Sequence, residues 1–231
     1  MLGGQRERLL AMVDILESVP PEEIRAIARR SAFTSLEARD AVLVAPGEHE
    51  ERLLLLLEGR ARVCEEGPAG RELTVSVVEG GTLVGATGFA SCRPWGLRVE
   101  ALEPSIVCGL RRRAFDELVG RCPTVGIRVA RLLGERLIGI EGRLADLARK
   151  EVPERLASQI LRLVEGEGLV TLEGYKIPTR YTHQQLATMI GANREAVTRA
   201  FGKLRCRGAV ELRSRRILVT DLETLERIAQ G

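Results

Sequence analysis

Three charged side chains, Arg194, Glu195 and Arg199, fall in the first turns of a predicted helix over residues 194–204, outside its apolar stripe. An arginine can donate two parallel hydrogen bonds to O6 and N7 of guanine, and a glutamate can accept one from N4 of cytosine. This combination at the start of a helix predicts that the helix reads base edges in the major groove of DNA. The alternative is an exposed Glu195–Arg199 pair, which would stabilise the helix by only about 0.3 kcal/mol.

A second predicted helix precedes this one. Thr182 can cap its start, Gly191 stands where the chain must turn with a positive φ, and Asn193 can cap the following helix. Apolar residues recur at the spacing that would pack the two helices together, namely at Leu186, Ala187, Ile190, Val197, Ala200 and Leu204. The sequence therefore predicts a helix-turn-helix.

Basic residues are concentrated around this motif. Residues 176–216 contain ten Lys or Arg residues and two acidic ones, whereas the whole chain carries a net charge of only +3 and residues 1–150 are balanced. On charge alone, a solvated surface would be the simpler interpretation. Because the basic residues surround a predicted helix-turn-helix, the pattern favours contact with a polyphosphate backbone.

The chain continues into two short predicted strands, residues 208–212 and 217–219, joined by a basic turn. This arrangement is typical of the wing that follows a helix-turn-helix. Arg215 at the tip of the turn is predicted to contact DNA phosphate, as are Asn193 and Lys203 on the second helix.

The first half of the chain has a different pattern. Residues 5–30 show helical periodicity, and from residue 31 to about residue 110 short Val- and Leu-rich runs alternate with glycine-bearing turns. This pattern predicts a small antiparallel sandwich or β-roll, a fold that can enclose a ligand or bury only its own side chains. The predicted class is α+β, with a sensor domain over 1–115, a dimerisation helix over 116–150 and a DNA-binding domain over 151–231.

A long helix is predicted after Phe115, with Pro123 in its first turns. Apolar residues recur along it every three or four positions, at Leu133, Leu137, Ile140, Leu144 and Leu147. A narrow heptad seam flanked by charged residues is typical of a helix that pairs with one partner helix. We therefore expect a homodimer, and the alternative is that this helix packs on its own domain.

Several other classes of protein are excluded by the sequence. The longest strongly apolar run, Leu53–Leu57, is far shorter than the roughly 20 residues of a membrane span, and the N-terminus has no apolar signal core. Five widely spaced cysteines without a C-x-x-C pair suit neither a disulfide framework nor a zinc cage. No hydrolase, P-loop or zinc-protease motif is present, so we predict no catalytic residue and no metal ligand. We expect a soluble, cytoplasmic protein that is not an enzyme.

Together these features resemble the cyclic-AMP receptor protein/fumarate–nitrate-reductase regulator (CRP/FNR) superfamily of bacterial transcription factors, over nearly the whole chain. The runs that carry the resemblance are Leu55–Val63, Gly70–Thr74, Val99–Glu103, Leu186–Gly191 and Arg194–Arg199. The resemblance implies an N-terminal β-roll of the cupin-like, cyclic-nucleotide-binding-domain fold. It also implies a long dimerisation helix and a C-terminal winged helix-turn-helix.

The resemblance also implies partners and contacts. The three charged residues of the second helix would read a half-site similar to TGTGA, and a twofold homodimer would bind an inverted repeat of double-stranded DNA. The residues that fall where the family contacts phosphate are Thr182, His183 and Gln184. RNA polymerase would be a further partner, and a membrane would not.

The implied effector pocket departs from the family pattern. Its residues would be Gly85, Ala86, Trp95, Gly96 and Ile140. Cyclic-nucleotide-binding members carry a glutamate that holds the ribose, where this chain has Ala86, and an Arg-Ser pair that grips the phosphate, where it has Trp95–Gly96. Ile140 replaces a hydroxyl-bearing contact to adenine. These differences argue against cyclic AMP and leave the effector unidentified, with no cofactor implied.

Three alternatives for the sensor stay open. A re-registered loop can bring Arg93 to the cyclic phosphate, haem can be held by residues other than those of the family's haem-based sensor, and Cys64 or Cys92 can sense oxidants if exposed.

Overall fold

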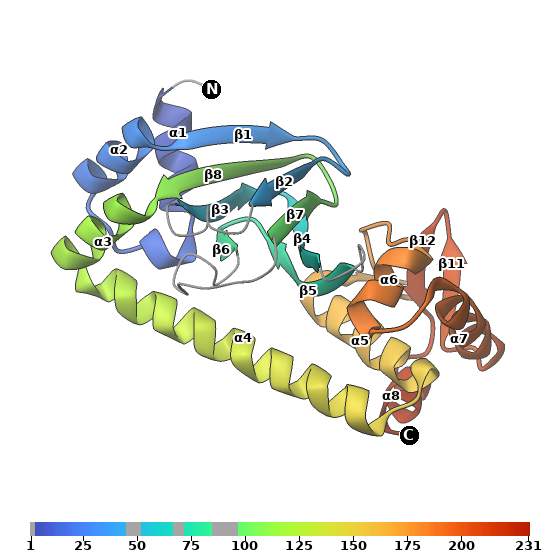
Figure 1. Ribbon diagram of the computed structural model, residues 1–231. Helices are drawn as coiled ribbons and strands as arrows, with labels where there is room; N and C mark the ends of the chain where they lie inside the picture. The colour runs from blue at the N-terminus through green and yellow to red at the C-terminus, as the bar shows by residue number, and fades with distance from the viewer. Residues whose placement is uncertain (1–2, 45–51, 67–71, 85–96) are drawn as a thin grey trace. The chain divides into compact units, whose positions relative to one another are not determined.

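The computed structural model describes residues 3–44, 52–66, 72–84 and 97–231 and divides the chain into two compact units, Met1–Ile138 and Gly139–Gly231. The first unit combines strands and helices, and the second is mainly helical, so the predicted α+β class is confirmed (Figure 1). The described part of the chain contains no helix with the length and apolar character of a bilayer span. The division into three domains at residues 115 and 150 stays a prediction.

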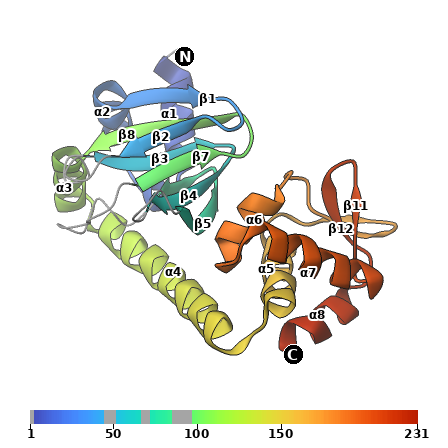
Figure 2. The same ribbon diagram turned by 45° about the vertical axis from the view of Figure 1, so that its right-hand side comes forward.

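The N-terminal unit begins with α1 (Gly3–Ala11), the 3-10 helix η1 (Asp14–Leu16) and α2 (Pro21–Arg30). The strands that follow are β1 (Ala32–Leu36), β2 (Ala41–Val44), β3 (Arg52–Glu58), β4 (Arg60–Glu66), β5 (Glu72–Glu79), β6 (Thr82–Val84), β7 (Leu97–Ala101) and β8 (Ser105–Arg111). They form two antiparallel sheets, ordered β1-β8-β3-β6 and β2-β7-β4-β5, which Figure 2 shows stacked as layers.

The five consecutive leucines of β3 explain how this unit is held together. Leu54 and Leu56 pack in the core between the two sheets, whereas Leu53, Leu55 and Leu57 belong to a second core formed with α1, η1 and α2. Successive side chains of a strand point to opposite faces, so a strand that is covered on both faces must be apolar throughout. Each buried leucine contributes about 1.5–3 kcal/mol to stability relative to an exposed one.

Three strands, β1, β6 and β7, show little of the Val- and Leu-rich pattern that predicts the β-roll. The side chains of β1 are mostly exposed because it is an edge strand, and β6 has only three residues. In β7 the apolar pattern is interrupted by Arg98 and Glu100. Glu100 is nevertheless buried because it accepts two hydrogen bonds from Arg62 on β4, at 3.1 Å from Nε and 2.8 Å from Nη2. This paired charge across two strands satisfies polar groups that would otherwise be costly to bury.

The long helix begins later than predicted. Residues Arg112–Arg121 form a separate helix, α3, and the long helix α4 spans Pro123–Arg149. Pro123 cannot continue α3, because proline lacks the amide hydrogen that a helix interior needs, whereas its fixed φ suits the first position of a new helix. The predicted segment 116–150 is therefore two helices.

One face of α4 packs on the N-terminal unit and another is uncovered. Val125 and Val129 are buried in the core, and Leu133, the first residue of the predicted seam, is half-buried against it. The rest of the seam, Leu137, Ile140, Leu144 and Leu147, is between 44% and 65% exposed. Ile127 and Ile138 are exposed as well, so the apolar stripe is wider than the heptad pattern indicated.

The C-terminal unit is a winged helix-turn-helix. Its elements are α5 (Val152–Glu167), β9 (Leu169–Thr171), β10 (Gly174–Lys176), α6 (His183–Ile190), α7 (Arg194–Cys206), β11 (Val210–Arg213), β12 (Arg216–Val219) and α8 (Leu222–Gln230). The strands form one sheet in the order β11-β12-β10-β9, and α5 packs against α6, α7 and α8. The predicted helix-turn-helix and wing are confirmed.

Gly59, between β3 and β4, gives a test of the β-roll. Its φ of +88° is unfavourable for other residues, and a Cβ there would lie 2.6 Å from the carbonyl oxygen of Pro104 and against Ser105 Oγ. We expect Gly59→Ala to lower the free energy of unfolding by more than about 2 kcal/mol in chemical denaturation. Gly120→Ala is the control, since a Cβ there meets nothing within 4 Å and should add about 0.5–1 kcal/mol in a helix. Equal effects of the two substitutions would contradict this account.

Candidate nucleic-acid interface

The start of α6 is fixed by a reciprocal pair of hydrogen bonds. Thr182 Oγ1 accepts from the backbone nitrogen of Gln185 at 3.1 Å, and the backbone nitrogen of Thr182 donates to Gln185 Oε1 at 2.9 Å. This capping box satisfies two amide groups that a helix start leaves without partners. Thr182 and Gln184 are exposed beside it, at the positions predicted to contact phosphate.

The turn between the helices is set by Gly191. Its φ of +61° and ψ of +46° are left-handed, a conformation that costs other residues roughly 1 kcal/mol. Asn193 then caps α7, because its Oδ1 accepts from the backbone nitrogen of Ala196 at 2.7 Å. Both predictions are confirmed, and together they determine how α7 leaves the turn.

Helix α7 buries one face and exposes the other. Val197, Ala200, Phe201 and Leu204 are at most 4% exposed, whereas Arg194, Glu195 and Arg199 are all exposed. In the ranges that the structure describes, none of these three charged side chains forms a salt bridge or a side-chain hydrogen bond, so the Glu195–Arg199 pair is not formed. Their hydrogen-bonding groups therefore face solvent.

His183 joins α6 to α7, a contact that the sequence pattern did not reveal. Its Nδ1 lies 2.8 Å from Thr198 Oγ1, and its ring stacks on Phe201 with 5.7 Å between the ring centres. Thr198 Oγ1 in turn donates to the backbone oxygen of Arg194 at 2.9 Å. The histidine is thus held against the first turns of the predicted reading helix.

A buried carboxylate positions the segment that leads into α6. The two oxygens of Glu167, at the end of α5, accept hydrogen bonds from the hydroxyl groups of Thr179 and Tyr181, each at 2.5 Å, and from the backbone nitrogen of Thr179 at 3.3 Å. All three residues are buried. The motif gave no indication of this network because Glu167 lies twelve or more residues before its partners.

At the tip of the wing, Ser214 and Arg215 have φ values of +52° and +62°. Two left-handed residues between β11 and β12 form the type of tight turn that prefers Asn-Gly. Arg213 pairs with Glu173 and Glu211, and Arg216 donates to the backbone oxygen of Pro178 at 2.7 Å. Among the described residues Arg215 has no such partner, so of the arginines around this turn it is the one available to a phosphate.

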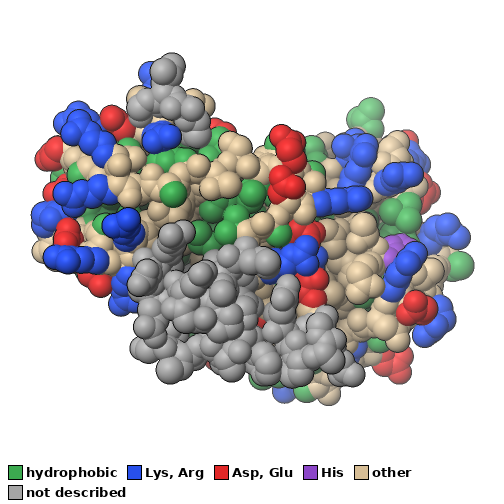
Figure 3. Space-filling model, turned by 45° about the horizontal axis from the view of Figure 1, so that its top comes forward, with side chains coloured by type: hydrophobic (Ala, Val, Ile, Leu, Met, Phe, Trp, Pro, Cys, Tyr) green, Lys and Arg blue, Asp and Glu red, His purple; other side chains and the backbone are tan. Residues whose placement is uncertain are grey.

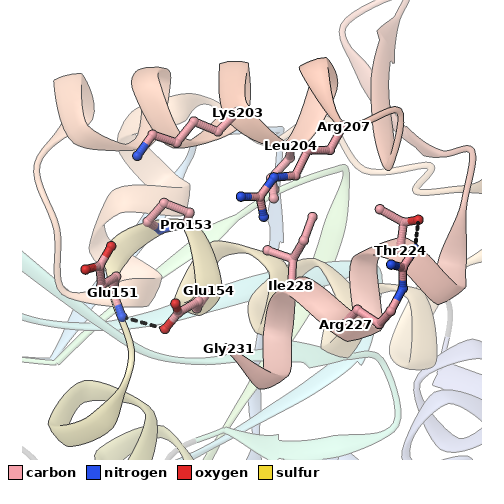
Figure 4. Close-up of a pocket in the computed structure, with 10 residues that line it drawn as sticks. All are labelled: Glu151, Pro153, Glu154, Lys203, Leu204, Arg207, Thr224, Arg227, Ile228 and Gly231. Atoms are coloured by element: carbon pink, nitrogen blue, oxygen red, sulfur yellow. Dashed lines mark hydrogen bonds between the residues drawn. The ribbon is translucent and has the colours of Figure 1, made fainter.

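Lys203 lies about one turn after Arg199 on α7. It lines a groove of about 570 Å³ between the start of α5, the end of α7 and α8, where its side chain points toward Glu151 (Figure 4). Arg207 and Arg227 line the same groove. Lys203 is exposed, and its predicted contact with phosphate stays a prediction.

The connection from α4 to α5 is held by Asp146. Burial raises the pKa of this carboxyl, but hydrogen bonds from Lys150 and Arg162, at 2.8 and 3.0 Å, outweigh burial and hold the pKa below its ordinary value. The charged form is therefore favoured, and this ion pair fixes the start of the unit that carries the helix-turn-helix.

Most of the predicted effector pocket lies outside the described residues, namely Gly85, Ala86, Trp95 and Gly96. Ile140 is on α4 and is exposed. The sequence reasoning missed Arg136, whose Nη2 donates to the backbone oxygen of Leu83 on β6 at 2.5 Å. Burial lowers the pKa of Arg136, and in the described part of the chain no carboxylate pairs with it.

Two cysteines are chemically unreactive in this fold. Burial raises the pKa of the Cys64 thiol to about 12 and that of Cys108 to about 11, so both are protonated near neutral pH. Cys206, at the end of α7, is exposed. Cys92 lies outside the described residues, as does His49.

Comparison with known proteins identifies the family. The model of the cyclic nucleotide-binding domain matches residues 37–122, and that of the Crp-like helix-turn-helix domain matches residues 154–228. A CRP-like cAMP-activated global transcriptional regulator of Mycobacterium tuberculosis is 25% identical over 224 residues, covering 97% of this chain and 100% of that protein. This chain belongs to the CRP/FNR superfamily. It is a transcriptional regulator with a DNA-binding helix-turn-helix.

Two further similar proteins cover most of the chain. The transcriptional regulator LdrP of Thermus thermophilus is 29% identical over 192 residues, covering 83% of this chain and 94% of that protein. The solved structure of a CooA mutant from Carboxydothermus hydrogenoformans has a TM-score of 0.76 at 20% identity, over 94% of this chain and 95% of that chain. The CRP/FNR fold is therefore present over nearly the whole chain.

The raised pKa values of the buried thiols predict their reactivity. At about pH 7 we expect iodoacetamide to alkylate Cys206 in the folded protein while Cys64 and Cys108 are protected, because only the thiolate reacts. Peptide mass spectrometry after short exposure measures this, and the unfolded protein, in which all cysteines should react, is the control. Fast alkylation of Cys64 in the folded protein would contradict the burial seen here.

Replacing Arg215, a left-handed residue in the turn of the wing, should stabilise the fold but weaken DNA binding. Arg215→Gly should raise the free energy of unfolding by about 0.5–1 kcal/mol, since glycine adopts a positive φ without strain, and should weaken DNA binding. Ser214→Asn is the matched control, because it relieves the same turn while leaving Arg215 in place. Denaturation and binding titrations measure both quantities, and equal affinities of the two variants would show that Arg215 does not contact DNA.

Proposed function

We propose that this protein regulates transcription as a homodimer that binds an inverted repeat of double-stranded DNA. The observation that carries the proposal is the exposed face of α7, where Arg194, Glu195 and Arg199 stand without ion-pair partners in the described residues while the opposite face is buried. These side chains have the donors and the acceptor that guanine and cytosine edges require. Each helix would read one half-site, which we expect to be similar to TGTGA.

Contacts to the phosphate backbone would fix the helix in its groove. The residues proposed for this role surround α7 and are Thr182, His183, Gln184, Asn193, Lys203 and Arg215. Lys and Arg side chains gather on the face of this unit seen in Figure 3, and a histidine surface lies among them. Such contacts position the protein without carrying sequence information.

The dimer would form through α4. Leu137, Ile140, Leu144 and Leu147 supply an exposed apolar seam, and Ile138 widens it. Leaving several large apolar side chains in water is unfavourable by about 1.5–3 kcal/mol each, so a second copy of the same helix would stabilise both protomers. A twofold axis along this seam also matches an inverted repeat in the DNA.

The sensor domain is proposed to respond to something other than cyclic AMP, or to need no effector. Ala86 and Trp95–Gly96 lack the groups that hold ribose and phosphate in the resemblance described above. The relative from Mycobacterium tuberculosis is described as cAMP-activated, so a re-registered binding loop is the alternative. The burial of Cys64 argues against oxidant sensing by that thiol. RNA polymerase is the proposed protein partner and the cytoplasm the proposed location.

The test is a fluorescence-anisotropy titration of a labelled inverted repeat of TGTGA-like half-sites and of a scrambled duplex at fixed salt. Arg199→Ala should lose about 1–3 kcal/mol of binding free energy on the repeat and relax the preference at one base pair. Lys203→Ala is the comparison, because loss of a phosphate contact should weaken binding to both duplexes similarly.

Equal losses on repeat and scrambled DNA for Arg199→Ala would overturn its base-reading role. The same titration with cyclic AMP separates the two sensor proposals. If cyclic AMP leaves the preference for the repeat over scrambled DNA unchanged, the result supports a non-nucleotide or constitutive regulator. If the protein prefers the repeat only when cyclic AMP is present, our interpretation of Ala86 and Trp95 is overturned.

A further inference from the structure

The contacts of Thr198 favour a proton on Nδ1 of His183 over a proton on Nε2. Thr198 has one hydroxyl hydrogen, and its Oγ1 donates it to the backbone oxygen of Arg194 at 2.9 Å. The two contacts of Thr198 Oγ1 can be made at the same time only if the 2.8 Å contact with His183 Nδ1 uses a hydrogen on Nδ1. Neutral imidazole has one N–H, so His183 Nε2 is an acceptor in the neutral ring.

The charged residues on the elements next to the ring are mostly basic. The basic residues of α7, which contacts the ring, lie within about two turns of Thr198 and are Arg194, Arg199, Lys203 and Arg205. Glu195, one turn before Thr198, is the acid of the helix start. The segment before α6 carries Arg180. Glu167, at the end of α5, which packs against α6, is engaged with Thr179 and Tyr181.

Within the described residues, no carboxylate forms an ion pair with His183, and Nε2 has no hydrogen-bond partner. A neutral Nε2 and a phosphate oxygen are both acceptors and cannot bond to each other. An imidazolium ring donates from both nitrogens and forms a charge-assisted bond to an anion.

We propose that His183 binds a DNA phosphate through Nε2–H only as the doubly protonated imidazolium, and that Thr198 is the positioning residue that imposes this requirement. This inference rests on the proposed function, since it assumes that α6 lies against the DNA backbone. Proton uptake then accompanies DNA binding, so affinity rises as pH falls through the range in which histidines gain charge.

The experiment measures the dissociation constant for the inverted repeat at fixed ionic strength between about pH 6 and about pH 8, the range that histidine dominates. We expect binding by the unmodified protein to be about tenfold tighter at the lower pH. His183→Gln should abolish this dependence. The chain has one other histidine, so His49→Gln is the matched control and should retain the full dependence.

Thr198→Val separates the positioning role from a general structural one. Without the hydroxyl, the neutral ring can carry its hydrogen on Nε2 and donate to phosphate, so the pH dependence should shrink mainly through tighter binding at the higher pH. A loss of affinity that is equal at every pH would mean that Thr198 acts only structurally and would overturn its assigned role.

The failure of this inference is distinguishable from that of the proposed function. A protein that prefers the repeat over scrambled DNA but binds with the same affinity at both pH values, or whose pH dependence survives His183→Gln, contradicts the inference alone. A protein with no preference for any inverted repeat contradicts the proposed function first. Circular dichroism of each variant confirms that the substitution has not unfolded the protein.

Discussion

The packing of α6 against α7 is the constraint on which the rest of the C-terminal unit depends. Gly191 turns the chain in a left-handed conformation, and Thr182 and Asn193 cap the helices on either side of it. With the apolar face of α7 buried at Val197 and Leu204, the opposite face must point outward. The proposed base-reading side chains are therefore positioned by the packing of two helices rather than by a loop, and the wing follows α7 in the chain.

In the N-terminal unit, the main constraint is the burial of one strand on both of its faces. Its β3 strand is covered on both faces, once by the second sheet and once by the N-terminal helices, which explains five buried leucines in a row. Arg62 on β4 and Glu100 on β7 are buried as a hydrogen-bonded ion pair, and Arg62 also contacts Glu72 and Thr74 on β5. The unit ends in α4, whose inner side is anchored by Val125 and Val129 and whose remaining apolar side chains are uncovered. That uncovered stripe is the structural basis for proposing a second copy as its partner.

The sequence predicted what depends on local signals. Caps, a left-handed glycine and a helical apolar stripe all lie within the helix-turn-helix, so its boundaries could be read directly. Contacts between distant segments were missed, such as Glu167 with Tyr181 and Arg136 with Leu83, because a linear pattern carries no pairing information. Strand β7 departs from an apolar pattern because its charged residue Glu100 is buried by pairing. The start of α4 differs from the prediction because Pro123 fits the first turn of a helix that has already begun as well as the start of a new one.

The most direct test of the central claim is selection of bound duplexes from a random library by the purified protein, followed by sequencing. We expect two inverted copies of one G·C-containing half-site, with centres about one helical turn apart. Replacing Arg199 by alanine should remove the G·C preference in both copies. Enrichment of a single asymmetric site, or an unchanged motif for that variant, would contradict the claim that two outward-facing α7 helices read the DNA.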